Sequence, residues 1–160
     1  MLALVGIGAL VMSACTATGG GTLQSACGSS ATPSATAGPV ATFGFAYDDV
    51  SGTFSGNLQD LCAGVNLTGA GPLAPTTQDP PAVFQQIAPG ALIGCVAGTA
   101  TYQSQNRANP GSGSLNIFGC GLSGQLQTAG LDFVSITVTS GPFVGYMNQG
   151  LLQQGSLVVR

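Results

Sequence analysis

Few side chains in this chain of 160 residues could carry out acid–base or nucleophilic chemistry. Seven side chains carry a formal charge, namely Asp48, Asp49, Asp60, Asp79, Asp132, Arg107 and Arg160. Histidine, lysine and glutamate do not occur in the sequence. Without imidazole there is no Ser-His-Asp triad, and without lysine there is neither Ser-Lys catalysis nor a Schiff base. We therefore expect no enzymatic activity, no catalytic residue and no cofactor.

The aspartates do not form an obvious metal site. Asp48 and Asp49 precede Gly52 in a stretch typical of a hairpin turn, where Asp bonds to nearby backbone groups. Together with Asp60 they would offer oxygen ligands to Ca²⁺ if their loops converged. Because the three carboxylates are spread over thirteen positions, we favour turn and structural roles.

The charge balance excludes one class of partner. The chain has two arginines and a formal net charge of −3 at pH 7. Nucleic-acid binding requires many basic contacts to phosphates, so we expect no nucleic-acid partner. Binding to a membrane surface through a polybasic patch is excluded for the same reason.

The N-terminal segment, residues 1–15, indicates export. It reads MLALVGIGALVMSAC, an apolar run too short to span a bilayer but long enough for a secretory signal. Small residues precede Cys15, as in bacterial lipoprotein signals, where the cysteine becomes the lipid-carrying N-terminus. We predict lipidation of Cys15 and a membrane-anchored protein of the cell envelope. The alternatives are a secreted protein cleaved near Ala14 or Ala17, and a buried apolar element.

Residues 16–39 are rich in Gly, Ser, Thr and Ala and lack a periodic apolar pattern. Such composition is typical of a flexible tether. We therefore expect a single β domain over residues 40–160.

Two hairpins define the centre of this domain. Pairing Asp48 with Thr53 brings three inward positions on each strand together, namely Tyr47 with Phe54, Phe45 with Gly56, and Phe43 with Leu58. The second hairpin is centred on the turn-rich stretch SQNRANPGS, and its register opposes Val96, Gly98, Ala100 and Tyr102 to Gly119, Ile117, Leu115 and Gly113. In both hairpins the apolar residues share one face, as a half-buried sheet requires.

The second register also predicts a disulfide. It opposes Cys95 and Cys120 on the other face, at a separation that a disulfide can bridge. If Cys15 carries lipid, Cys27 and Cys62 remain, and they pair by elimination. Two disulfides agree with an exported protein.

Further strands are predicted at Val65–Thr68, Val134–Val138, Tyr146–Gln149 and Gly155–Val159, with one short helix at residues 81–88. A long Gly- and Pro-rich loop is expected over residues 69–90. Short strands without crossover helices predict an all-β fold, a single antiparallel β-sandwich or open barrel of about seven short strands.

The tyrosines and one sequon-like motif are also interpreted from the pattern. Tyr47 and Tyr102 are expected in the core, whereas Tyr146 follows a Gly-Pro turn and is expected to be exposed to a partner. Residues 66–68, Asn-Leu-Thr, match the N-glycosylation pattern but are expected to be ordinary strand residues.

The order of short motifs resembles the post-COAP-type small β domain of bacterial exported proteins. The motifs are Phe43-Gly44-Phe45, Gly52, Gly56, Leu58, the stretches 97–100, 113–118 and 131–138, Tyr146, Gly150 and the closing stretch 155–159. The resemblance covers roughly residues 40–160. It implies an exported β module with no established enzymatic activity.

Two functions remain after these exclusions. The first is a non-catalytic, lipid-anchored structural or binding module of the bacterial cell envelope, whose partners are the membrane and a protein. The second is a self-assembling surface or matrix subunit, because low charge and exposed strand edges favour association.

Overall fold

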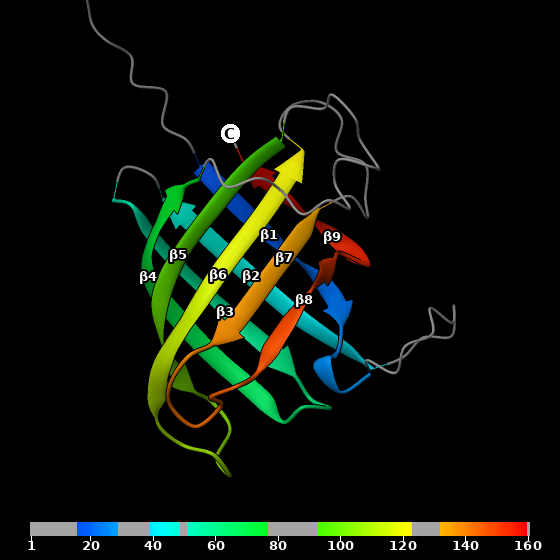
Figure 1. The fold of residues 1–160 in the computed structure, drawn as a ribbon, viewed down its shortest axis with the longest axis vertical. Coiled ribbons are helices and arrows are strands. Elements are labelled where there is room, and N and C mark those ends of the chain that lie inside the picture. Colours follow the sequence, from blue (N-terminus) through cyan, green and yellow to red (C-terminus); the bar gives the residue numbers. More distant parts are fainter. Residues whose placement is uncertain (1–15, 29–38, 49–50, 77–92, 123–131, 160) are drawn as a thin grey trace, which may run out of the picture.

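A single antiparallel sheet, curled into a half-barrel, makes up the computed structural model (Figure 1). The structure describes residues 16–28, 39–48, 51–76, 93–122 and 132–159. The nine strands are β1 (Thr16–Gln24), β2 (Val40–Asp48), β3 (Thr53–Asp60), β4 (Val65–Pro75), β5 (Ile93–Ser104), β6 (Ser112–Leu122), β7 (Phe133–Val138), β8 (Met147–Leu151) and β9 (Gln154–Val159). Their order in the sheet is β8-β7-β6-β5-β4-β3-β2-β1-β9. The prediction of an all-β antiparallel fold is confirmed. The structure has one curled sheet and not the two packed sheets of a sandwich, and it has nine strands where about seven were expected.

Both predicted hairpin registers are confirmed. In the β2–β3 hairpin Asp48 pairs with Thr53, and the three predicted inward pairs follow. In the β5–β6 hairpin Val96 pairs with Gly119 and Tyr102 with Gly113, again as predicted. The alternation of apolar residues was sufficient to predict both registers, because a slip of one residue would turn every apolar side chain to the solvent face.

The strands alternate between an apolar inner face and an outer face on which Asp48 is the one charged side chain of the described strands. The inner face forms one large core that includes Phe43, Tyr47, Leu58, Tyr102 and Leu115. The tyrosine predictions for Tyr47 and Tyr102 are confirmed, since both are buried. A second, smaller cluster surrounds the buried Cys95 and Cys120 on the outer face, with Phe133 and the partly buried Phe118 and Leu151.

The predicted tether is wrong over its first part. Residues 16–24 form strand β1, which pairs with β2 on one side and with β9 on the other. The misleading signal is the glycine run 19–21, which resembles a linker. A Cβ at Gly19 would lie 3.0 Å from a ring carbon of Phe45, and a Cβ at Gly21 would overlap the carbonyl oxygen of Gln154. The glycines therefore allow neighbouring strands and side chains to approach closely.

Two strand boundaries also differ from the predictions. Strand β4 continues to Pro75, so the expected loop begins later than Gly69. The chain leaves β8 at Leu152 and Gln153, and not at Gly150. Residues 66–68 lie within β4, as expected of ordinary strand residues. The predicted signal segment, residues 1–15, and the predicted helix, residues 81–88, lie outside the described residues.

The curl of the sheet brings its last strand against the inner face of β6. A Cβ added at Gly119 would lie 3.1 Å from a methyl carbon of Leu157, and one at Gly121 would overlap the Leu157 carbonyl oxygen. Gly155, whose φ is +95°, allows β9 to pass close to the carbonyl oxygen of Gly20. Gly119 and Gly121 of β6 therefore permit the sheet to fold over onto itself, and Gly155 permits the close pairing of β9 with β1.

Candidate functional site

The described ionisable side chains other than tyrosine and cysteine are four in number, and two of them are buried. Asp60 is 0% exposed and Asp132 is 6% exposed, whereas Asp48 and Arg107 lie on the surface. A buried carboxylate is costly unless hydrogen bonds compensate for its lost hydration. The partners of Asp60 and Asp132 therefore decide whether either aspartate is free for chemistry.

The Asp60 carboxylate accepts four hydrogen bonds. Its Oδ1 accepts the Ser25 hydroxyl at 2.5 Å and the Ala63 N–H at 3.1 Å. Its Oδ2 accepts the Ala26 N–H at 3.0 Å and the Tyr146 hydroxyl at 3.1 Å. The donors come from the segment after β1, the turn after β3 and the residue before β8. Asp60 thus joins three segments that are distant in sequence.

The hydrogen bonds decide the charge of Asp60. Burial acts to raise its pKa, but the bonds from Ser25, Ala63, Ala26 and Tyr146 outweigh burial and hold the pKa below its usual value of 3.8. The side chain is therefore an ionised carboxylate at neutral pH. With both oxygens occupied by donors, it is poorly suited to act as a general base.

Tyr146 is not an exposed partner contact, which corrects the prediction for it. The side chain is partly buried, and its hydroxyl donates to Asp60 and accepts from Asn148 Nδ2 at 3.2 Å. Burial, together with the negative charge of Asp60, raises the pKa of Tyr146 despite the hydrogen bond from Asn148. Tyr146 therefore stays protonated and serves as a donor. Asn148 Nδ2 also donates to the Gln24 carbonyl at 3.0 Å, which ties β8 to the end of β1.

Asp132 makes a similar connection at the opposite end of the half-barrel. Its Oδ2 accepts the backbone N–H of Leu157 in β9 at 2.6 Å. Its backbone carbonyl accepts the N–H of Leu152, which follows β8, at 2.8 Å. Asp132 therefore ties the start of β7 to the last strand, where β9 has no strand partner on its second side.

The buried polar residues among the described positions are Ser25, Asp60, Asp132 and Asn148. Ser25, Asp60 and Asn148 connect the end of β1 and the segment after it with the end of β3 and with β8. Asp132 connects the start of β7 with β9. We call this set the polar seam. Edge strands β8 and β9 do not pair with each other, so side-chain hydrogen bonds complete the closure that a continuous ladder would provide. The hydrogen bonds of the two buried carboxylates thereby connect segments on the two sides of the sheet.

Sequence reasoning missed Ser25 and Asn148 as members of the seam. Ser25 fell within the expected tether, and Asn148 is one of many polar residues in a strand. The only available signal was the low number of charged residues, since an Asp that is retained in so neutral a chain invites a structural explanation. Contacts across 35 to 124 positions, such as Ser25 with Asp60 and Asn148 with Gln24, leave no local pattern.

Both predicted cysteine pairs are joined. Cys95 and Cys120 face each other in the β5–β6 register with a Cα–Cα distance of 4.2 Å and an S–S distance of 2.10 Å. Cys27 and Cys62 form the other disulfide, with a Cα–Cα distance of 6.0 Å. The Cys27–Cys62 disulfide lies beside Asp60. The disulfide and the hydrogen bonds of Asp60 therefore both connect the segment after β1 with the turn after β3. The predicted lipidation residue, Cys15, lies outside the described residues.

The Ca²⁺ site considered for the aspartates is wrong for Asp48 and Asp60. Asp48 pairs with Thr53 and Asp60 with Ala41, at opposite ends of the β2–β3 hairpin. Seven strand residues separate these ends by about 23 Å at the usual strand rise. Among the described residues, no three His, Cys, Asp or Glu side chains group together as metal ligands. Asp49 lies outside the described positions.

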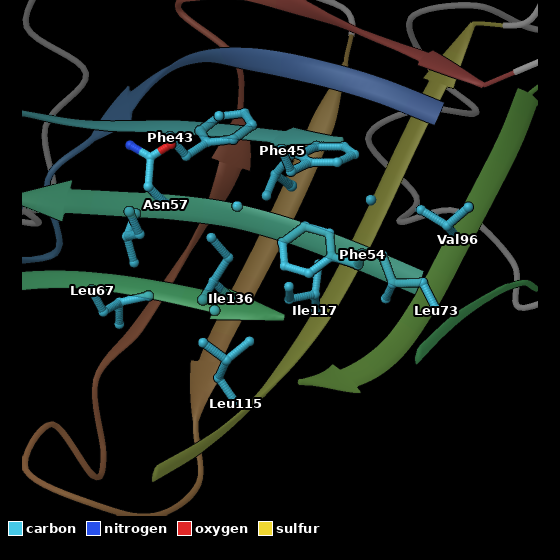
Figure 2. Close-up of a pocket in the computed structure, with 16 residues that line it drawn as sticks. Phe43, Phe45, Phe54, Asn57, Leu67, Leu73, Val96, Leu115, Ile117 and Ile136 are labelled. Atoms are coloured by element: carbon cyan, nitrogen blue, oxygen red, sulfur yellow. The ribbon is translucent and has the colours of Figure 1, made fainter. Parts of the chain in front are cut away.

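The interior of the half-barrel contains a narrow apolar cavity of about 30 Å³ (Figure 2). Phe43, Phe45, Phe54 and Ile117 are among the residues that line it. The rings of Phe45 and Phe54 lie 5.6 Å apart between centroids, and both fill the space above the glycine at position 56. Small-molecule sites usually enclose about 300–1,000 Å³. This interior therefore acts as a packed core.

Within the part of the chain that the structure describes, no helix is long and apolar enough to cross a membrane. Comparisons with known proteins found no family model, no curated protein and no solved structure that matches this chain.

Proposed function

We propose that this chain is a non-catalytic, exported module of the bacterial cell envelope, anchored to the membrane through lipid on Cys15. The observation that carries the non-catalytic role is the polar seam. Both buried carboxylates are occupied by hydrogen bonds that close the half-barrel. The resemblance to post-COAP-type domains supports the same class of function.

Two further features support export and anchoring. Two disulfides favour an oxidising compartment, where such bonds persist. Strand β1 begins at Thr16, the residue that follows Cys15. A lipid on Cys15 would therefore hold the β domain directly at the membrane surface, with no tether between them. A low count of basic residues argues against a nucleic-acid partner.

Detergent partitioning tests the anchor. The full chain is expressed in a bacterium with its natural start, beside a Cys15→Ser variant and a Ser13→Ala control that keeps the cysteine. We expect the wild type and the control to enter the detergent phase, and Cys15→Ser to remain in the aqueous phase. Equal partitioning of all three proteins would remove the anchor from the proposal.

Self-assembly is the second candidate function, and one edge of the sheet favours it. In the sheet, strand β8 pairs only with β7, although Asn148 also ties it to the end of β1. It contains no charged residue and no proline, and it carries Met147 with 55% exposure. Such an edge lacks the charges that usually prevent strand-to-strand association. Size-exclusion chromatography at rising protein concentration tests this candidate, since a concentration-independent monomer would exclude it.

A further inference from the structure

The outer face of strands β5 to β8 carries two adjacent rows of uncharged side chains. The strand registers place Thr99, Asn116, Thr137 and Met147 in one row, and Ala97, Phe118, Ser135 and Gln149 in the next. Each row crosses four strands and spans about 14 Å at the usual strand spacing. The two rows therefore form an extended surface and not a single point of contact.

The surface between the rows is hollowed. This hollow, which we call the outer groove, has a volume of about 330 Å³ and is lined by Thr99, Asn116, Phe118, Ser135 and Thr137. It is an open depression of the sheet surface and not an enclosed pocket. The groove lies on the face opposite the core, so a ligand could enter it without any opening of the sheet.

The polar groups of the groove are only partly used within the protein. The Thr99 hydroxyl donates to Asn116 Oδ1 at 3.0 Å, which orients the amide and leaves its N–H groups without an acceptor among the described residues. Ser135 and Thr137 are partly buried residues, and neither side chain makes a hydrogen bond to the described part of the chain. As far as the described residues go, two hydroxyls and one oriented amide therefore remain for a ligand.

The distribution of charged residues indicates whether a ligand of the groove would be charged or neutral. No residue that lines the groove is ionisable. The exposed charges of the described residues are Asp48, at the end of β2, and Arg107, in the turn between β5 and β6. An anionic or cationic ligand would lose hydration in the groove without meeting an opposite charge. The groove therefore suits an uncharged ligand with many hydroxyl groups.

We propose that the outer groove binds a neutral polysaccharide chain. Sugar hydroxyls would exchange hydrogen bonds with Asn116, Ser135 and Thr137, and the apolar faces of sugar rings would lie on Phe118 and Met147. A second copy of this chain fits less well, because stable protein interfaces have an apolar core and Met147 is the only exposed large apolar residue of these rows. This inference rests on the proposed binding role of the module and adds its ligand class.

Nuclear magnetic resonance titration tests the groove. The full chain is exported with Cys15→Ser, so that the outcome for the lipid anchor does not affect the measurement. Cellohexaose and hexa-N-acetylchitohexaose are the neutral probes, and hexagalacturonate is the acidic comparator. We expect at least one neutral probe to shift the amide signals of residues 97–99, 116–118 and 135–137, and the acidic comparator to leave them unchanged.

Matched variants separate the groove from the rest of the outer face. Asn116→Ala/Thr137→Ala should weaken binding at least about fivefold, since two direct hydrogen bonds are lost. Asn57→Ala/Thr42→Ala makes the same chemical change on exposed residues of β3 and β2 and should leave binding unchanged. If the double variant loses its dispersed spectrum and is therefore unfolded, the milder Ser135→Ala replaces it, and it should also weaken binding.

Several results would overturn the proposal. These are no shift with either neutral hexasaccharide at millimolar concentration, an equal response to hexagalacturonate, and equal weakening in both double variants. Shifts of the groove signals with protein concentration alone would assign the surface to a second copy of the chain. None of these results would change the outcome of the partitioning experiment, so the ligand and the anchor can fail separately.

Discussion

At the scale of single residues, Asp60 is the buried side chain whose hydrogen bonds connect the most segments of the fold. It accepts bonds from Ser25, Ala26, Ala63 and Tyr146 while fully buried. An amide in its place would turn one acceptor into a donor that faces other donors. We expect Asp60→Asn to lower the free energy of unfolding by about 3 kcal/mol, measured by chemical denaturation. The exposed Asp48→Asn is the matched control, and it should stay within about 0.5 kcal/mol of the wild type. Equal effects of the two substitutions would contradict the buried network.

The same carboxylate predicts an acid-sensitive stability. The pKa of Asp60 is lower in the folded chain than its usual value of 3.8, so the unfolded chain binds more protons at acidic pH. The contribution of Asp60 is therefore complete above about pH 5 and is lost as the pH falls through its folded pKa. The difference in unfolding free energy between wild type and Asp60→Asn should narrow as the pH falls below about 5. A difference that stays constant across this range would show that Asp60 does not titrate as the network requires.

The disulfides give a residue-scale prediction for the covalent frame. Peptide mapping without reduction should yield one fragment that joins Cys95 to Cys120 and another that joins Cys27 to Cys62. Loss of the first bridge in Cys95→Ser/Cys120→Ser should cost roughly 3 kcal/mol through loop-closure entropy. A fragment that joins Cys95 to Cys62 would be incompatible with the β5–β6 register.

At the scale of elements, β1 is the strand whose existence is most open to a simple test. A Cβ at Gly21 would overlap the Gln154 carbonyl oxygen, whereas a Cβ at Gly150 in β8 has no atom within 4 Å. We expect Gly21→Ala to destabilise the protein by roughly 2 kcal/mol and Gly150→Ala to leave its stability unchanged or slightly higher. Thermal unfolding of both variants makes the comparison. If residues 16–24 were a tether, both substitutions would be neutral.

The elements also show which parts of the structure could be predicted from the sequence. The alternation of Phe43 and Phe45 with small residues predicted the β2–β3 register, because each choice of register assigns a whole face to the core. The pairing of Cys95 with Cys120 followed from the same principle. Strand β1 could not be predicted, because its glycines are selected by the close approach of Phe45 and Gln154, which tertiary structure alone creates.

The polar seam and the outer groove depend on contacts that were harder still to predict from the sequence. Tyr146 was expected at the surface because it follows a turn, and its bond to Asp60 spans 86 positions. No local pattern encodes such a contact. The outer groove was also beyond prediction, since it depends on the registers of four strands taken together.

At the scale of the whole molecule, the half-barrel combines a charge-poor outer face with an interior sealed by the polar seam. The N-terminal strand and the last strand lie side by side, with Ala17 paired to Val159. Because Thr16 directly follows Cys15, the end of the molecule that carries Thr16 would face the membrane if Cys15 is lipidated. The Asp60 network and the Cys27–Cys62 bridge would then lie at the end that points away from it.

Intact-mass spectrometry of the mature protein, purified from bacterial membranes, tests the central proposal most directly. A lipid-anchored module predicts a chain that begins at Cys15 and carries the added mass of the lipid. The Cys15→Ser variant should lack this mass. A mature chain that begins after Ala14 or Ala17 without lipid, or that retains residues 1–14, would contradict the anchored module.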